Sequence, residues 1–149
     1  LIEYMKSKRR DYHTMITLGT SKGSWAALKF GKLAEVDKVI AISPFTGCGE
    51  QVYQDFPPDC WKYLEHDHGV IPIDDLKPLY AADPIPHVHV YLTDGEGPNP
   101  TIVDRTMAER VRAHEITLIP GHTHGAHDSH PGGASVVRGE GHIKRIIFG

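Results

Sequence analysis

The fold of this chain is decided by the segment Met15-Ile16-Thr17-Leu18-Gly19-Thr20-Ser21-Lys22-Gly23. It is a short apolar run that breaks into Gly-x-Ser-x-Gly and continues into a stretch of small and apolar residues at 24–31. Two glycines around a single serine at this spacing are typical of a nucleophile elbow, a sharp turn from a strand into a helix. Because side chains at Gly19 and Gly23 would collide in such a turn, the pattern explains both glycines.

Ser21 is expected at the tip of this turn, with its hydroxyl facing outward. The backbone N–H of Lys22, at the start of the following helix, is then placed to donate to a developing oxyanion. An ordinary strand-to-helix turn has the same composition, since Gly, Ser and Thr are common in loops. The predicted strand before the motif and helix after it favour the catalytic interpretation.

The composition fits one α/β domain over residues 1–149. The chain has 149 residues, a net charge of −3 and 40% hydrophobic residues, enough for a core. The slight acidity and the lack of a Lys/Arg-rich face argue against nucleic acid as a partner. No apolar run approaches the roughly 20 residues that span a bilayer, so we expect no membrane partner. No signal peptide is visible, which favours a cytoplasmic location.

The sequence leaves two questions open, one about its cysteines and one about its histidines. Cys48 and Cys60 are the only cysteines, and they are compatible with either a bridge or two thiols. Of the eleven histidines, six lie in the last third of the chain: His114, His122, His124, His127, His130 and His142. That region therefore needs an explanation of its own.

Hydrophobic patterning predicts strands that alternate with helices. Strands are expected at 14–18, 37–43, 88–93 and 115–119. Helices are expected at 22–33, 73–82 and 101–113, and the tail of an amphipathic helix at 1–10. This alternation predicts a parallel sheet with helices on both faces, a three-layer α/β sandwich.

Two regions depart from that alternation. Residues 45–72 are rich in Gly, Pro, aromatic and acidic residues, and we interpret them as a cap-like insertion with short helices at 51–56 and 59–66. Residues 120–133 form a histidine-rich loop, followed by a short closing helix at 142–148. A cap of this kind is the usual place for substrate selection.

Reactive side chains follow three of the predicted strands. They are Ser21, then Asp94 or Glu96, then His122, His124 or His127. Because reactive groups gather at the carboxyl ends of parallel strands, these residues are expected to meet at one edge of the sheet. A histidine must take the proton of a serine hydroxyl for it to attack, and a carboxylate must orient that histidine.

The choice within each group follows from position. Asp94 directly follows its strand and is therefore better fixed than Glu96, two residues on. The Pro-Gly-x-x-His spacing after the last strand favours His124 over His122 and His127. Exposed turn residues would look the same in sequence, so the nearby acids and histidines stay as alternatives.

This order of serine, acid and histidine resembles the C-terminal half of a serine α/β-hydrolase. Gly-Thr-Ser-Lys-Gly at 19–23 follows one strand, Thr-Asp-Gly-Glu at 93–96 another, and Pro-Gly-His-Thr-His at 120–124 the last. The Ser-Lys-Gly elbow followed by Trp-Ala-Ala-Leu is similar to hydrolase-like proteins of bacterial surface-polysaccharide and glycoprotein modification, including O-acetyltransferases. The resemblance implies acyl transfer from a small-molecule or carbohydrate ester, without a cofactor.

The chain departs from that family before the elbow, where the family has several strands and a loop that supplies a second oxyanion donor. Only a short segment precedes the elbow here. We therefore expect a partner chain, or a further N-terminal segment, to complete the sheet. Without it, the flank of the elbow strand would be an open edge.

A metal site is a competing interpretation of the histidine loop. His122, His124, His127 and His130 have spacings that can converge on zinc. They resemble the His-x-His-x-Asp-His signature of metallo-β-lactamase-like hydrolases, but Ala126 stands where the metal-binding aspartate belongs. A third interpretation is an interaction domain that has the fold and not the chemistry.

Overall fold

A parallel four-stranded sheet forms the centre of the chain. The computed structural model describes residues 1–60, 73–93 and 98–119. The strands lie in the order β1-β2-β3-β4, and every neighbouring pair is parallel. Their bounds are β1 (Ile16–Thr20), β2 (Lys38–Ile42), β3 (His87–Thr93) and β4 (Glu115–Ile119). The predicted parallel α/β architecture is confirmed.

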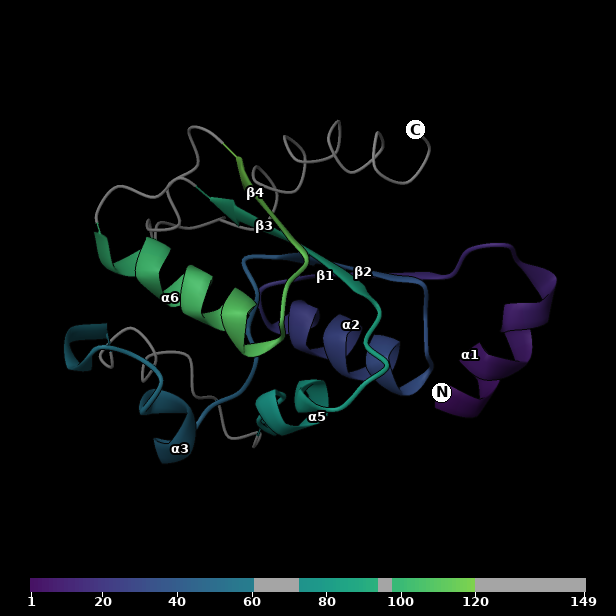
Figure 1. Cartoon of the computed structure of the whole chain (residues 1–149), viewed down its shortest axis with the longest axis horizontal. Coiled ribbons are helices and arrows are strands. Elements are labelled where there is room, and N and C mark those ends of the chain that lie inside the picture. The colour runs from purple at the N-terminus through teal and green to yellow at the C-terminus, as the bar shows by residue number, and fades with distance from the viewer. Residues whose placement is uncertain (61–72, 94–97, 120–149) are drawn as a thin grey trace.

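The connecting helices described in the structure lie along one face of this sheet (Figure 1). α2 (Lys22–Leu33) joins β1 to β2, and α6 (Pro98–Arg110) joins β3 to β4. The shorter α5 (Lys77–Ala81) precedes β3. The remaining elements are α1 (Ile2–Lys8), a 3-10 turn (Arg9–Asp11), α3 (Glu50–Tyr53) and a second 3-10 turn (Pro58–Cys60).

Most predicted elements are confirmed, and three helices differ at their ends. The helix predicted at 51–56 is the shorter α3 (Glu50–Tyr53), and the one predicted at 59–66 begins as a 3-10 turn (Pro58–Cys60), with residues 61–66 outside the described ranges. α5 is shorter than the predicted helix at 73–82, because the side chain of Asp75 accepts the N–H of Lys77 at 2.9 Å and fixes the start of the helix there. α6 begins and ends three residues earlier than predicted, and Arg112 follows it with a left-handed φ of 53°. The helix predicted at 142–148 lies outside the described residues.

Close packing of α2 on the sheet explains its small residues. A Cβ added at Gly31 would lie 2.5 Å from Oγ1 of Thr17 on β1 and 2.8 Å from a methyl of Val39 on β2. The hydroxyl of Thr17 donates to the carbonyl of Ala27 at 2.9 Å, so strand and helix are also hydrogen-bonded. Leu28 is fully buried in the same core. Helix and sheet can approach this closely only where side chains are small.

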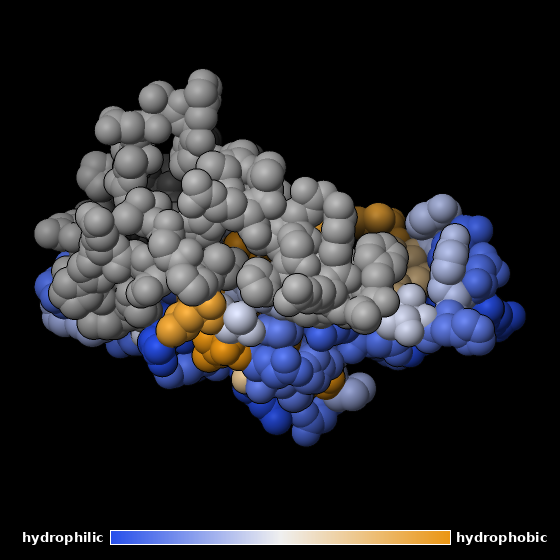
Figure 2. Space-filling model, turned by 90° about the horizontal axis from the view of Figure 1, so that it is seen from above, coloured by the Kyte–Doolittle hydropathy of each residue, from blue (hydrophilic) through white to orange (hydrophobic). Residues whose placement is uncertain are grey.

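The opposite face of the sheet carries a separate apolar cluster, formed by Ile16, Ile40, Ile42 and Tyr91. At the outer strands, apolar side chains reach solvent: Leu18 on β1, and Ile116 and Leu118 on β4. Hydrophobic surface is visible on the described part of the chain in Figure 2. Within the described ranges, no helix has the length and hydropathy that crossing a membrane requires.

Residues 45–60, the described part of the predicted cap, pack against the helices through an apolar cluster of their own. Phe45, Val52, Phe56 and Cys60 are buried there together with Met107 of α6. Trp25 of α2 packs against this cluster as well as against the main core. Cys48 and Cys60 are both free thiols, which answers the question left open by the sequence.

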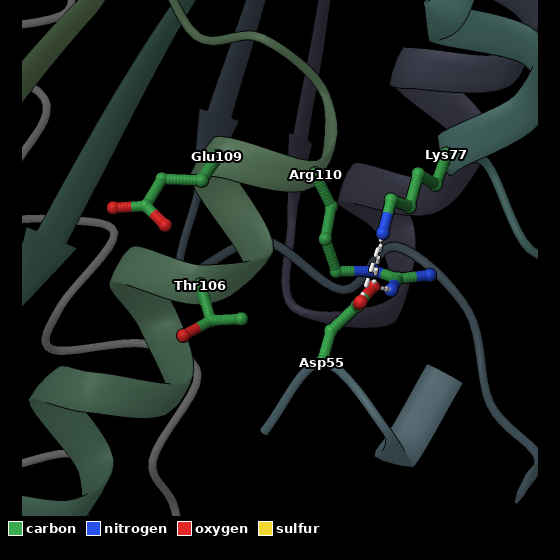
Figure 3. Close-up of a pocket in the computed structure, with 5 residues that line it drawn as sticks. All are labelled: Asp55, Lys77, Thr106, Glu109 and Arg110. Carbon is green, nitrogen blue, oxygen red and sulfur yellow. Dashed lines mark hydrogen bonds and ion pairs between the residues drawn. The ribbon is translucent and has the colours of Figure 1, made fainter. Parts of the chain in front are cut away.

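A buried arginine connects this segment to α5 and α6. Arg110 forms ion pairs with Asp55 and Asp75, and its Nε donates to the hydroxyl of Thr46 at 3.2 Å. Lys77 also contacts Asp55, at 2.8 Å. Figure 3 shows Arg110 and Lys77 meeting at the Asp55 carboxylate. They border a cavity of about 220 Å³. These contacts join three segments that are far apart in the sequence.

Replacing Arg110 by methionine should lower the free energy of unfolding by about 2 to 4 kcal/mol, because two partly buried carboxylates lose their partner. Arg112→Met is the matched control. The Arg112 side chain is 48% exposed, against 2% for Arg110, and its ion pair with Asp83 lies at the surface. We expect a change below about 0.5 kcal/mol there. Urea unfolding measures both, and equal effects would contradict the role given to Arg110.

Candidate active site

Ser21 lies between β1 and α2 in a strained backbone conformation. Its φ is 51° and its ψ is −123°, a combination that residues with a side chain rarely adopt. Thr20 is still in the strand and Lys22 is already in the helix, so the whole change of direction takes place at this one residue. Ser21 is exposed. Strain of this kind costs on the order of 1 to 3 kcal/mol and clusters at functional sites.

The two glycines of the motif are not equivalent. A Cβ at Gly19 would lie 2.2 Å from the carbonyl oxygen of Gly23, so no side chain fits there. A Cβ at Gly23 would have no atom within 4 Å. The expectation that both positions need glycine is therefore right for Gly19 and wrong for Gly23. The backbone of residue 23 itself occupies the space beside Gly19.

Four hydrogen bonds hold the turn in place. The N–H of Ser21 donates to the carbonyl of Ile42 at 2.9 Å, which extends the pairing of β1 with β2. The carbonyl of Ser21 accepts the N–H of Ser24 at 3.0 Å and also the hydroxyl of Ser24. That hydroxyl accepts the N–H of Phe45 at 2.7 Å. Sequence analysis missed Ser24, since a serine in a first helical turn carries no signal of a contact 21 residues away.

Lys22 opens α2, so its backbone N–H lies at the positive end of the helix dipole. α2 has 12 residues and points this end at the turn that carries Ser21. An N–H in this position can stabilise negative charge that develops next to the Ser21 hydroxyl. The expected place of Lys22 at the start of the helix is confirmed, and its role as an oxyanion donor stays a prediction.

The acid and histidine candidates lie outside the described residues. This applies to Asp94 and Glu96, and to His122, His124, His127 and His130. The strand ends that precede them are described, and Thr93 at the end of β3 pairs with Ile119 at the end of β4. The two segments that hold these residues therefore leave the sheet from adjacent strands, at the same edge as Ser21.

The described histidines that contact one another belong to the opposite end of the strands. Nε2 of His87 lies 2.7 Å from Oε1 of Glu115, and His114 stacks on His87 with ring centroids 4.9 Å apart. The hydrogen bond from His87 lowers the pKa of Glu115, while burial lowers the pKa of His89. Over the ranges that the structure describes, no group of three His, Cys, Asp or Glu residues could hold a metal ion.

Asp104 on α6 is a titratable group that sequence analysis did not single out. Burial raises the pKa of Asp104 from 3.8 to about 7. A carboxyl group with a pKa near neutrality is protonated over part of the physiological range, so its charge depends on pH. The sequence carries no signal of this shift, because a helical aspartate is ordinarily exposed.

Comparisons with known proteins support the fold. No family model matches the chain, and no curated protein does. Among solved structures, it is similar to an α/β hydrolase enzyme from the metagenome of sediments of the Mar Chica lagoon in Morocco. The TM-score is 0.53 at 18% identity, and the match covers 97% of this chain and 69% of that one. A monoacylglycerol lipase from Paleococcus ferrophilus matches with a TM-score of 0.49 and 11% identity, over 98% and 73% of the two chains.

The similarity to the Mar Chica enzyme shows an α/β-hydrolase fold, in agreement with the parallel sheet and the helices of this chain. At 18% identity it shows the fold alone, because one fold supports many activities. Function has to be argued from the site.

Gly19→Ala should disrupt the turn at Ser21, since its Cβ would lie 2.2 Å from the Gly23 carbonyl oxygen. We expect a loss of about 2 kcal/mol or more in unfolding free energy. Gly23→Ala is the matched control: its Cβ meets no atom within 4 Å, and alanine favours the helix by up to about 1 kcal/mol. Thermal unfolding distinguishes the two variants. If Gly23→Ala lowered the Tm as much as Gly19→Ala, the close approach of strand and helix would not lie at Gly19, as the structure has it.

Asp104→Asn should stabilise the protein at pH 8 more than at pH 4. The native state binds a proton at Asp104 up to a pH of about 7, whereas the unfolded state releases it near pH 3.8, so stability falls between these values as pH rises. The amide removes this loss, which is on the order of 2 to 4 kcal/mol above pH 7. The Tm at the two pH values measures the difference. Equal shifts for Asp104→Asn at both pH values would contradict the burial argument.

Proposed function

We propose that this chain performs serine-dependent acyl transfer, as an esterase or an O-acetyltransferase, with Ser21 as the nucleophile. The observation that carries the proposal is the backbone of Ser21, exposed and strained at the carboxyl edge of a parallel sheet, with the N-terminus of α2 directly behind it. Backbone strain at Ser21 lowers the stability of the fold. A nucleophile has to present its hydroxyl to the substrate, and this requirement explains why the strained conformation is kept.

The proposed reaction begins with attack by Oγ of Ser21 on the carbonyl carbon of an ester. His124 takes the hydroxyl proton, and Asp94 orients the imidazole and stabilises its positive charge. Glu96, His122 and His127 are the alternatives for these two roles. The N–H of Lys22 donates to the oxyanion of the tetrahedral intermediate. His124 then returns the proton to the departing alcohol, which leaves an acyl group on Ser21.

The second half of the reaction decides between hydrolysis and transfer. Water or a carbohydrate hydroxyl gives its proton to the histidine and attacks the acyl carbonyl, and Ser21 is released with its proton restored. The cap-like segment is the proposed place for selecting the small-molecule or carbohydrate ester. Phe45 follows β2 next to the elbow and leads into the apolar cluster of residues 45–60, which supports this assignment.

The open edge of β1 supports the proposal that a further strand completes the sheet, from a partner chain or an N-terminal segment. β1 pairs with β2 alone in the described sheet, and Leu18 on it is 51% exposed. A strand added at this edge would cover Leu18 and lie next to Ser21. It would also bring a backbone N–H to the position of the second oxyanion donor.

Exposure to a fluorophosphonate probe, followed by intact-mass spectrometry, tests the proposal. We expect one adduct on the wild type, none on Ser21→Ala, and no change on addition of a chelator. Ser7→Ala is the matched control, since Ser7 is an exposed serine on α1 whose hydroxyl donates to the carbonyl of Tyr4. This variant should be labelled like the wild type.

Three outcomes would count against the proposal. No adduct on the wild type would favour the non-catalytic interaction domain. An adduct that persists in Ser21→Ala would place the reactive group elsewhere. Activity on esters that is lost with a chelator would favour the metal-dependent hydrolase formed by the histidine loop.

A further inference from the structure

We infer that Ser24 is a positioning residue, one that holds the strained turn at Ser21 in its reactive shape by connecting it to the segment after β2. This inference rests on the proposed role of Ser21 as a nucleophile. Ser24 is fully buried, and its hydroxyl makes two hydrogen bonds, one to each segment. Because Ser24 has no exposed surface and its contacts with Ser21 are to the main-chain carbonyl, it acts through the backbone of Ser21.

The first contact of Ser24 fixes the carbonyl of Ser21. This carbonyl accepts two hydrogen bonds from the same residue, from the N–H of Ser24 at 3.0 Å and from its hydroxyl. With a φ of 51° and a ψ of −123°, Ser21 has a backbone conformation that is intrinsically unfavourable for a residue with a side chain. A strained residue keeps such a conformation only when its surroundings determine it, and the two bonds to one carbonyl supply that restraint.

The second contact of Ser24 satisfies a backbone donor in a buried segment. The N–H of Phe45 donates to the Ser24 hydroxyl at 2.7 Å, and Phe45 is 8% exposed. A hydroxyl has one proton to donate and lone pairs to accept with, so it can serve both contacts at once. Neither alanine nor cysteine replaces it, because alanine has no polar atom and a thiol is a weak donor and acceptor.

The segment that Ser24 holds is strained as well. Ser43, at the end of β2, has a φ of 46°, and its N–H donates to the carbonyl of Tyr91 at 2.8 Å. Thr20 pairs with Ile42, so Ser21 and Ser43 leave neighbouring strands at the same level of the sheet. Ser24 therefore bridges two strained strand exits, and its loss should let both relax together.

This arrangement predicts where the effect of a substitution appears. Relaxation of the elbow moves the Ser21 hydroxyl and the Lys22 N–H relative to a bound carbonyl, and small misplacements of reacting groups are costly in rate. The chemical step should therefore suffer, while binding of the probe, which depends on the surface of the site, stays the same. A residue with a purely structural role would lower stability without this selective effect.

The test measures the rate of fluorophosphonate labelling at Ser21 as a function of probe concentration. For Ser24→Ala and the nearly isosteric Ser24→Cys, we expect the limiting rate to fall roughly tenfold or more, with an unchanged concentration at half-maximal rate. The matched control is Thr17→Val. It removes another partly buried hydroxyl bond between β1 and α2, from Thr17 to Ala27, and it should lower the Tm without altering the limiting rate.

A second measurement does not depend on chemistry. Amide hydrogen exchange at Phe45 should be faster in both Ser24 variants than in the wild type and in Thr17→Val, because the N–H of Phe45 loses its acceptor. An unlabelled wild type would contradict the proposed function and leave this exchange measurement as the test of the bridge. If the wild type is labelled and the limiting rates of Ser24→Ala, Ser24→Cys and Thr17→Val are equal, the inference about Ser24 is overturned while the proposed function stands.

Discussion

The structure depends on the close approach of two backbone segments at the end of β1. The position where a Cβ of Gly19 would lie is occupied by the carbonyl of Gly23, so strand and helix turn back on each other within a single residue. That residue is Ser21, and it takes up the whole change of direction as backbone strain. The tight turn also determines how α2 lies on the sheet, where Gly31 allows a second close approach, to Thr17 and Val39.

The parallel pairing of the strands determines where the segments that follow them begin. Thr20 pairs with Ile42, and Thr93 pairs with Ile119, so the segments that follow the four strands all begin at one edge. The proposed acid and histidine partners of Ser21 follow β3 and β4, and the pairing of these two strands brings their exits together at the edge where Ser21 lies. The contacts of His87 with His114 and Glu115 lie at the opposite end of the strands, away from this edge.

Two kinds of interaction hold the parts around the sheet. α2 and α6 pack by apolar contact with β2 and β3, whereas residues 45–60 are joined to α6 both by their apolar cluster, which includes Met107, and by the ion pairs of Arg110 with Asp55 and Asp75. Apolar packing tolerates small shifts, but a buried guanidinium needs its carboxylates in place. The segment that the proposed function assigns to substrate selection is thus held by directional contacts as well as by apolar packing, next to the turn that Ser24 bridges.

Sequence alone determined the features that depend on local pattern: the strands and their order along the chain, the helix at Lys22–Leu33, and the turn at Ser21. These follow from apolar periodicity and from glycine spacing, which act over a few residues. The tertiary structure decided that Gly19 needs to be glycine and Gly23 does not, that Ser24 bonds to Phe45, and that Arg110 is buried between two aspartates. Each of these joins residues whose proximity depends on how the helices and the sheet pack, and no pattern within one segment records that packing.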